Sequence, residues 1–285
     1  MAYNRVVNLK AGTVDQALMV SGLDVSFKVE RSRAFASNSA QIEIFNPSET
    51  TINDILKEGN SVVLEAGYED EGVGVIFIGQ ITTSVPSNNG VDTIVKIEAQ
   101  SLQGSDTPLS SLVVSLSYKP DTTLNKPLEE IATAMGLATY GLDLVSDLKL
   151  TNGYVFTGLA KNALKYCREI IEKDGLILYV DNDIMYVVAE ANNSDVKSAY
   201  MTPDSGLLEA APLKSTKKKG AKDEKKLANK ITFTSILNPQ VGPNSVIEVD
   251  NYRNVFGLYV VDKCTFTGSN FGSSPFTIQG EGIGV

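Results

Sequence analysis

The sequence predicts an α+β fold that is mainly β, with two related small β-barrel domains and a smaller α/β insertion between them. Short strands of alternating apolar and polar residues fill residues 20–101 and again 231–285. Two amphipathic helix patterns lie between these regions, and the two strand-rich regions share an internal repeat. The expected units are a first β-barrel domain over 1–108, an α/β middle domain over 109–212, a Lys-rich loop or linker over 213–230, and a second β-barrel domain over 231–285.

Strand periodicity is clearest at the two ends of the first region. In residues 24–30 the apolar Val25, Phe27 and Val29 alternate with polar residues, and residues 95–100 repeat this pattern. A period of two is that of a strand with one buried face. Further strands are expected at 40–45, 61–66 and 75–82, separated by turn-forming residues. Short strands at this spacing favour a small barrel or sandwich.

The middle of the chain carries helical spacing. Apolar residues at i, i+3, i+4 and i+7 follow Pro127 and end at Gly136, which predicts a short helix. A second helix is expected over 158–174, where an apolar stripe ends before Gly175. This stripe consists of Ala160, Ala163, Leu164, Cys167 and Ile171, and it is interpreted as core rather than as a cofactor site.

A hairpin is expected directly after the second helix. Residues 176–180 and 184–188 are apolar runs on either side of Asp181-Asn182-Asp183. The acidic triplet superficially suggests a calcium loop, yet Met185 and Tyr186 stand where an oxygen ligand and a glycine would be required. A polar hairpin turn packed on the second helix is therefore the interpretation.

The Lys-rich segment is the one strongly charged feature of the chain. Residues 214–230 hold eight lysines against Asp223 and Glu224, whereas the whole chain has a net charge of -9. Composition favours a solvated loop, and the functional hypothesis is that it lines a channel or touches a partner protein or passing DNA. The candidate contact residues are Lys217, Lys218, Lys219, Lys222, Lys225 and Lys226.

The internal repeat links the two strand-rich regions. Asn60-Ser61-Val62-Val63 matches Asn244-Ser245-Val246-Ile247, and a tyrosine follows seven residues after the serine in each copy. The repeat-related aromatic residues are Tyr68, Phe77, Tyr252 and Tyr259, which are expected in the core rather than at an interface. Gly90 and Gly272 then occupy corresponding turns. Two distant copies indicate a duplicated domain, and a trimer of such chains would present six like units in a ring.

Composition narrows the chemistry. The chain has no histidine, which excludes Ser-His-Asp and Cys-His hydrolysis and histidine-ligated zinc, while carboxylate, lysine or tyrosine chemistry stays open. The net charge of -9 argues against a general nucleic-acid binder. No catalytic, cofactor or metal site is predicted, because Gly72-Val73-Gly74 lacks the spacing of a dinucleotide fingerprint and Glu69-Asp70-Glu71 is typical of a solvated turn.

Cysteine usage and hydropathy bear on where the protein resides. Cys167 and Cys264 lie in different expected units and are interpreted as buried free thiols. No apolar run approaches the roughly 20 residues of a spanning helix, and residues 1–10 lack the pattern of a signal peptide. We therefore expect a protein made and kept in a reducing cytoplasm, without insertion into a membrane.

Several motifs, in their order along the chain, resemble a known family. Residues 38–48, Glu65-Ala66-Gly67-Tyr68 and residues 76–81 resemble the first barrel of the baseplate hub, or late control protein D, family of tailed phages, which also has relatives in contractile injection systems. Residues 245–250 and 257–261 and the turn at 268–276 resemble the end of that family. The likeness covers both strand-rich regions and, more loosely, residues 161–188.

The resemblance implies a non-enzymatic structural protein of the virion, located in the tail baseplate and assembled in the host cytoplasm. It implies a homotrimer whose pseudo-sixfold ring of barrels joins the tail tube to a central spike, with the tape-measure protein and transient DNA passage as further contacts. Two alternatives stay open. One is a distal tail or other adaptor ring, which would be hexameric, and the other is a carboxylate-dependent cell-wall hydrolase or carbohydrate-binding module.

Overall fold

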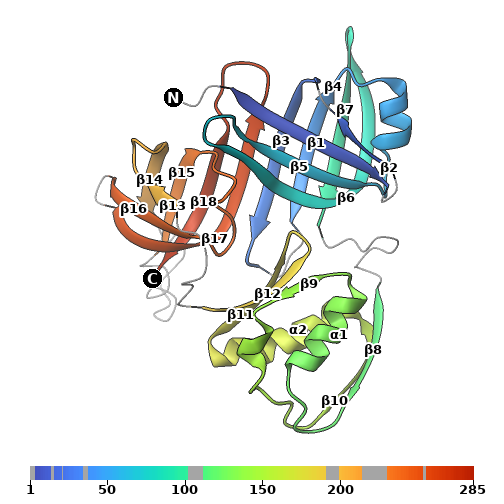
Figure 1. Ribbon diagram of the computed structural model, residues 1–285, viewed down its shortest axis with the longest axis vertical. Coiled ribbons are helices and arrows are strands. Elements are labelled where there is room, and N and C mark those ends of the chain that lie inside the picture. The colour runs from blue at the N-terminus through green and yellow to red at the C-terminus, as the bar shows by residue number, and fades with distance from the viewer. Residues whose placement is uncertain are drawn as a thin grey trace, which may run out of the picture.

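The computed structural model describes residues 4–13, 16–20, 22–34, 38–101, 112–190, 199–213, 230–252 and 255–285. Strands dominate, and an α/β unit lies below a large β part, as Figure 1 shows. This arrangement confirms the prediction of a mainly β, α+β fold. The first strands lie on one side of the β part and the last strands on the other.

Eighteen strands are assigned within these ranges. The first seven and last six are β1 Arg5–Thr13, β2 Gln16–Val20, β3 Val25–Ser32, β4 Ser39–Phe45, β5 Ser61–Tyr68, β6 Gly72–Asn89, β7 Asp92–Gln100, β13 Ala199–Met201, β14 Leu207–Pro212, β15 Lys230–Ile236, β16 Val246–Tyr252, β17 Val255–Ser269 and β18 Thr277–Gly284. All thirteen belong to one sheet.

The α/β unit contains the remaining strands and both α-helices. Its elements are β8 Val113–Tyr118, α1 Asn125–Ala134, β9 Ala138–Tyr140, β10 Tyr154–Leu159, α2 Ala160–Ile171, β11 Leu176–Asp181 and β12 Ile184–Ala189. Short helical turns are η1 Thr51–Ile55, η2 Leu142–Val145 and η3 Glu172–Asp174. The helices pack between the β8–β10 pair and the three-stranded β9–β12–β11 sheet (Figure 1).

The predicted helices and hairpin are confirmed, with adjusted ends. α2 buries the whole expected stripe from Ala160 to Ile171, but it begins two residues later than expected, because Gly158 and Leu159 pair in β10. β11 and β12 form the expected hairpin, and its two turn residues, Asn182 and Asp183, have φ angles of 45° and 60°. Such left-handed backbone is what a tight two-residue hairpin turn requires.

Strand pairing in the large sheet differs from two separate barrels. The order is β14-β15-β18-β17-β3-β4-β7-β6-β5-β1-β2, with β13 and β16 attached beside β17. Pairing among the described strands closes no ring, so closed barrels are not confirmed. The two halves merge because residues 263–269 of β17 pair with residues 26–32 of β3. β13 and β14, from the range expected for the middle unit, also pair in this sheet.

The same strand order occurs twice. The series β3-β4-β7-β6-β5 in the first half corresponds to β14-β15-β18-β17-β16 in the second, and every neighbouring pair is antiparallel in both. We call these two series the first and second repeats. Their agreement gives the internal similarity of the sequence a structural basis.

Backbone hydrogen bonds fix how the two repeats superimpose. Ile81 donates to Asn60 and accepts from Gly59, at 2.9 and 2.8 Å. Val261 makes the same two bonds with Ser245 and Asn244. Asn60 therefore corresponds to Ser245, one residue away from the match expected from the sequence. Because side chains alternate along a strand, this shift decides which residues share the buried face.

The hydrophobic side chains form two cores. One core joins both repeats and includes Tyr68, Phe77 and Phe276, which are all essentially inaccessible to solvent. The other lies inside the α/β unit, around Leu128 and Cys167. The contact between the sheet and the α/β unit lies between these cores.

Candidate functional site

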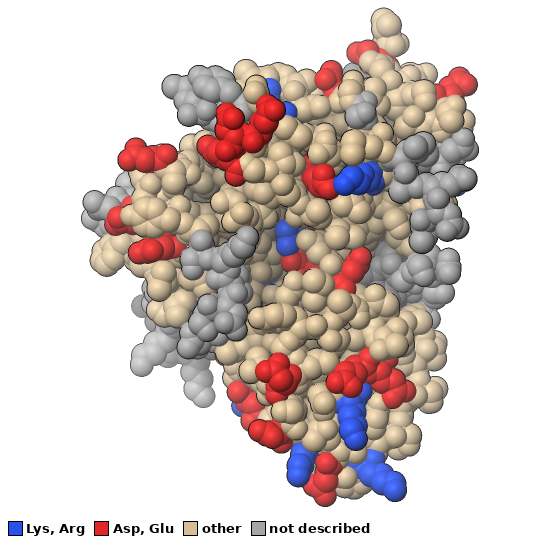
Figure 2. Space-filling view, viewed as in Figure 1, with Lys and Arg blue, Asp and Glu red and all other residues tan. Residues whose placement is uncertain are grey.

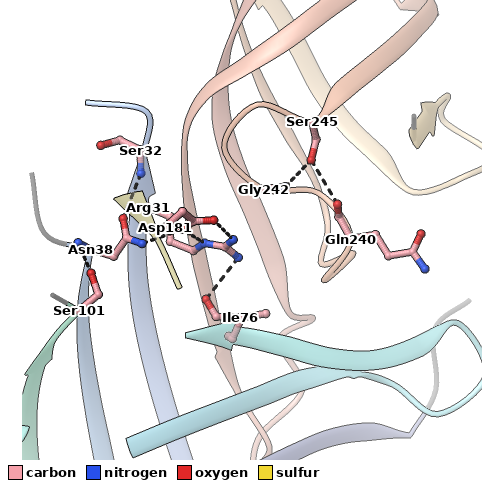
Figure 3. Close-up of polar contacts among 9 residues, drawn as sticks. All are labelled: Arg31, Ser32, Asn38, Ile76, Ser101, Asp181, Gln240, Gly242 and Ser245. Atoms are coloured by element: carbon pink, nitrogen blue, oxygen red, sulfur yellow. Dashed lines mark hydrogen bonds and ion pairs between the residues drawn. The ribbon is translucent and has the colours of Figure 1, made fainter. Parts of the chain in front are cut away.

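A cluster of buried polar residues joins the large sheet to the α/β unit. We call it the polar joint and define it as Arg31, Arg33, Asn38, Tyr179, Asp181 and Asn244. These residues come from β3 and the segment after it, from β11, and from the loop before β16. Figure 3 shows the arginine and the carboxylate facing each other between the ribbons.

Arg31 and Asp181 form the centre of the joint. Nε of Arg31 donates to Oδ1 of Asp181 at 3.0 Å, and Nη2 donates to Oδ2 at 2.6 Å (Figure 3). Both side chains are 8% exposed. A two-bonded arginine–carboxylate pair fixes direction as well as distance. The pair therefore sets the orientation of the β11–β12 hairpin relative to β3.

Neighbouring groups complete the hydrogen bonding of this pair. Nδ2 of Asn38 donates to Oδ1 of Asp181 at 2.7 Å. The backbone N–H of Asn38 donates to the hydroxyl of Ser101, and the N–H of Ser101 donates to the carbonyl of Asn38. The loop at Gly242 approaches Arg31 so closely that an added Cβ would lie 3.0 Å from Nη2. Any larger residue at position 242 would therefore press on the guanidinium group, which would have to shift slightly.

A second buried arginine extends the joint toward the second repeat. Nη1 of Arg33 donates to the amide oxygen of Asn244 at 3.2 Å, and its Nε lies 3.5 Å from a carboxylate oxygen of Asp262. Asp262 is the residue that β17 skips in its pairing with β18, and its carbonyl accepts the backbone N–H of Arg33 at 2.8 Å. The bulge thus directs Asp262 toward the joint.

Electrostatics favour charged side chains in this buried place. Burial alone would lower the pKa of Arg31, but the charge of Asp181 and its hydrogen bonds raise that pKa above the ordinary value. Burial raises the pKa of the Tyr179 hydroxyl, and the Asp181 charge adds to this effect. Arg31 stays protonated and paired, so the arrangement serves as a fixed connection.

Two clefts adjoin the joint. One has a volume of about 350 Å³ and is lined by Arg31, Tyr186 and the loop at Gln240. The other has a volume of about 680 Å³ and is lined by charges of both signs, including Arg168 and Glu172. In the larger cleft the ammonium group of Lys230 lies 3.4 Å from a carboxylate oxygen of Asp262, so charges there are paired.

The outward face of the large sheet is polar and carries paired charges. Cross-strand ion pairs join Lys96 to Glu43 at 3.2 Å and Lys263 to Glu281 at 2.8 Å. On the side of the molecule seen in Figure 2, acidic side chains gather over the β5–β6 turn, whereas basic and acidic side chains lie together at the lower end, on the α/β unit. At these two ion pairs, the positive and negative charges of the outward face are matched.

The residues singled out in the sequence have different outcomes. The six candidate lysines from Lys217 to Lys226 lie outside the described residues, so their role stays a prediction. Tyr68, Phe77 and Tyr259 are buried as expected, and the side chain of Tyr252 is outside the described set. Both cysteines are free and buried, as predicted.

The acidic turn and the helices complete this survey. Glu69, Asp70 and Glu71 are exposed, and Glu69 accepts a hydrogen bond from the side chain of Asn4. Within the described ranges, acidic and cysteine side chains form no group of three that could hold a metal ion. No helix in the described part of the chain has the length and apolar character needed to cross a membrane.

Sequence reasoning missed the polar joint. Arg31 belongs to an alternating strand, and Asp181 was attributed only to a polar turn. One signal was present, since Arg31 and Arg33 continue the positions of Val25, Phe27 and Val29, which form the buried face of β3. An arginine on a buried face requires a partner, but nothing local identifies it.

Known structures share this fold. A tail protein of 43 kDa from prophage MuSo2 of Shewanella oneidensis is similar with a TM-score of 0.63 and 11% identity, covering 99% of this chain and 98% of that one. A tail protein from Neisseria meningitidis MC58 gives 0.62 and 10%, covering 99% and 97%. The Escherichia coli c3393 protein, a type VI secretion component described as similar to the T4 tail proteins gp27 and gp5, gives 0.61 and 8%, covering 97% and 76%.

Sequence comparison assigns the family. A comparison with curated proteins finds no match. The family described as Baseplate hub gp41, however, matches residues 5–253, which is most of the chain. Together with a fold shared with tail proteins over nearly its whole length, this match places the protein among phage structural components, and the chain belongs to the baseplate hub gp41 family.

Proposed function

We propose that the chain is the structural subunit of a tail hub in which three copies form a pseudo-sixfold ring that joins the tail tube to the central spike. The observation that carries this proposal is the repeated strand order together with the β3–β17 pairing. Three copies with two like repeats each present six like units, which match a sixfold neighbour. The α/β unit occurs once per chain, so three copies of it match a threefold neighbour.

The repeats also suggest where neighbouring copies meet. Within the chain, the first strand of one repeat, β3, pairs with the second half of the long strand of the other, β17. In the second repeat the strand that corresponds to β3 is β14, and in the first repeat the strand that corresponds to β17 is β6. No described strand pairs with the outer edge of β14 or with β6 beyond Gln80 on the side of β5. Figure 1 shows these edges on opposite sides of the β part, as a head-to-tail ring requires.

In this ring β14 of one copy pairs with β6 of the next. The register of the β3–β17 contact, transferred to these strands, places Ala211 opposite Ser87, as Lys28 lies opposite Thr267. The polar face of the sheet then lines the channel, and its ion pairs leave little net charge to hold passing DNA. We also propose that the described α/β unit ends near residue 190, because β13 and β14 pair in the large sheet.

Cysteine cross-linking tests the ring. Ser87→Cys combined with Ala211→Cys places thiols at a pair without mutual backbone bonds, where the Cβ atoms are closest, about 4.5 Å apart, which is the upper end of the range for a disulfide. Oxidation of tails containing this variant is expected to yield covalent trimers. The matched control is Ser87→Cys with Ser117→Cys, whose second site is exposed on the α/β unit. Covalent hexamers would instead favour the adaptor ring, and no cross-linking would reject this interface.

The non-enzymatic part of the proposal has its own test. The family is one of structural baseplate proteins, and the polar joint pairs its carboxylate with an arginine. Purified chain is therefore expected to leave peptidoglycan intact in a zymogram. Clearing that disappears when Glu69, Asp70 and Glu71 are replaced by their amides would establish the hydrolase alternative.

A further inference from the structure

The two edges assigned to the contact between copies carry prolines at corresponding positions. Ile81 in β6 corresponds to Val261 in β17. Pro86 and Phe266 lie five residues beyond these positions, so Pro86 corresponds to Phe266. Pro212 lies opposite Ile231 of β15, and Val29 lies opposite Ala40 of β4. Since these pairs correspond, Pro212 corresponds to Val29. In the β3–β17 contact, Val29 and Phe266 are directly opposite each other. Pro86 and Pro212 would therefore meet in the contact between copies.

Hydrogen-bond directions show what the prolines remove. Arg33 donates to Asp262, and Asn270 donates to Val25, so alternate residues of β3, including Val29, direct their backbone groups toward β17. Val29 and Phe266 thus form a hydrogen-bonded pair, and both side chains are fully buried. In the contact between copies the corresponding pair would be Pro86 and Pro212, neither of which has a backbone N–H.

Both prolines direct their nitrogen toward the outer edge. Leu213 donates to Lys230 of β15 at 2.8 Å, so the preceding Pro212 faces away from β15. Asn89 and Asp92 flank a two-residue turn, so their backbone groups face each other and those of Pro86 face away from β7. Proline on an outer edge limits pairing with other chains. Pro86 and Pro212 are both exposed.

We propose that Pro86 and Pro212 make the contact between copies weaker than the corresponding contact within the chain, so that the hub subunit stays monomeric until a neighbouring tail component gathers three copies. This inference rests on the proposed ring. The partner at this surface is a second copy of the same chain. The contact between copies lacks the two hydrogen bonds that Val29 and Phe266 make within the chain. This loss is equivalent to about a tenfold to hundredfold weaker association at each contact.

Restoring the missing donors tests the inference. The double variant Pro86→Val, Pro212→Val and the wild-type chain are compared by sedimentation velocity over a range of concentrations. The variant is expected to form closed trimers at concentrations at least tenfold lower than the wild type. The control is Pro120→Val, an exposed proline in the α/β unit, which is expected to leave association unchanged.

The outcomes separate this inference from the ring itself. Equal association of variant and wild type, in tails whose Ser87 and Ala211 cysteines cross-link, would overturn the role of the prolines and leave the ring standing. Absence of that cross-link would overturn the ring. If the double variant does not fold, as judged by circular dichroism, each single variant is measured, because one restored donor is expected to give part of the gain. Single variants with wild-type association would overturn the inference.

Discussion

The hydroxyl of Tyr68 makes two hydrogen bonds with the backbone of Phe276, which lies 208 residues further along the chain. It accepts the N–H of Phe276 at 2.7 Å and donates to its carbonyl at 3.1 Å. The carbonyl of Phe276 also accepts from Leu237, but its N–H has Tyr68 as its described partner. One side chain of the first repeat thus completes the backbone pairing of the second.

Replacing Tyr68 by phenylalanine is expected to lower the free energy of unfolding by about 1–3 kcal/mol, because a buried N–H loses its partner. Urea denaturation measures this change. The matched control is Tyr200→Phe, whose hydroxyl donates to Asp250 at an exposed site and should contribute less than about 0.5 kcal/mol. Equal effects of the two substitutions would show that the Tyr68 contact is not important for stability.

The polar joint should be sensitive to loss of one partner. Asp181→Asn leaves the buried guanidinium of Arg31 without its counter-charge, and we expect a loss of about 3–5 kcal/mol in unfolding free energy. Hydrogen exchange should increase first in β11 and β12. Glu43→Gln, which removes an exposed ion pair with Lys96, should cost at most about 1 kcal/mol.

A second variant separates pairing from packing in the joint. The double substitution Arg31→Met, Asp181→Leu removes both charges and should recover most of the stability that Asp181→Asn loses. A double variant no more stable than Asp181→Asn would mean that the bonds to Asn38 and to the carbonyl of Ile76 matter more than the ion pair.

Asp183 gives the protein a pH dependence of known sign. Burial, and then the neighbouring charge of Asp181, raise the pKa of Asp183 above its ordinary value of 3.8. The folded state therefore binds this proton more tightly than the unfolded state, so the carboxylate destabilises the fold at neutral pH. That destabilisation decreases as the pH falls through the raised pKa and is gone below the ordinary one.

Asp183→Asn should accordingly raise the unfolding free energy at pH 7, and the difference from wild type should shrink as the pH approaches 4. Asparagine also tolerates the left-handed backbone at this turn position. Thermal unfolding at pH 7, 5.5 and 4 measures the effect. A constant difference over this range would show that backbone preference, rather than titration, causes the gain.

The two native cysteines should be inert in the folded protein. Burial raises the pKa values of Cys167 and Cys264 to about 12, so neither thiol forms the reactive thiolate near neutral pH. Reaction with a chromogenic disulfide reagent at pH 8 is expected only after unfolding in guanidinium. Rapid release from native protein would reveal an opening motion around α2 or β17, and Cys167→Ala would identify which.

The repeat can be tested by exchanging packing between its copies. Phe233 lies opposite Gly280 in the second repeat, and the corresponding pair in the first is Ile42 and Ile97. A Cβ at Gly280 would lie 2.4 Å from the Phe233 ring, so Gly280→Ile should cost about 1–3 kcal/mol or more. Adding Phe233→Ile should recover most of that loss. A double variant no better than Gly280→Ile would argue against equivalent packing.

Local patterns predicted the elements better than their connections. The alternation from Val25 to Val29 and the stripe from Ala160 to Ile171 indicate buried faces directly, and the structure has both. The repeat was also found, but its match was shifted by one residue. Identical residue types favoured a match of Asn60 with Asn244, whereas the strand pairing is set by the bulges next to Ile81 and Val261.

Long-range polar contacts were beyond sequence reasoning for a physical reason. Arg31 and Asp181 are 150 residues apart, and each has an ordinary local explanation as a strand residue or a turn residue. The joining of the two strand-rich regions into one sheet was missed similarly, because β3 and β17 each show the period of two whichever strand they pair with. β13 and β14 are short and follow the helical region, and nothing in their sequence indicates that they pair with β16 and β15 in the large sheet.

The pairing of β3 with β17 also has a consequence for synthesis on the ribosome. The paired residues lie 231 to 243 positions apart, so β3 emerges, and can pair with β4, long before β17 exists. During that interval the other edge of β3 offers unpaired backbone groups to any nascent chain nearby. Contacts of such high sequence separation also form slowly. This edge can therefore close only after β17 has emerged, and until then polysome-bound chains would benefit from a chaperone.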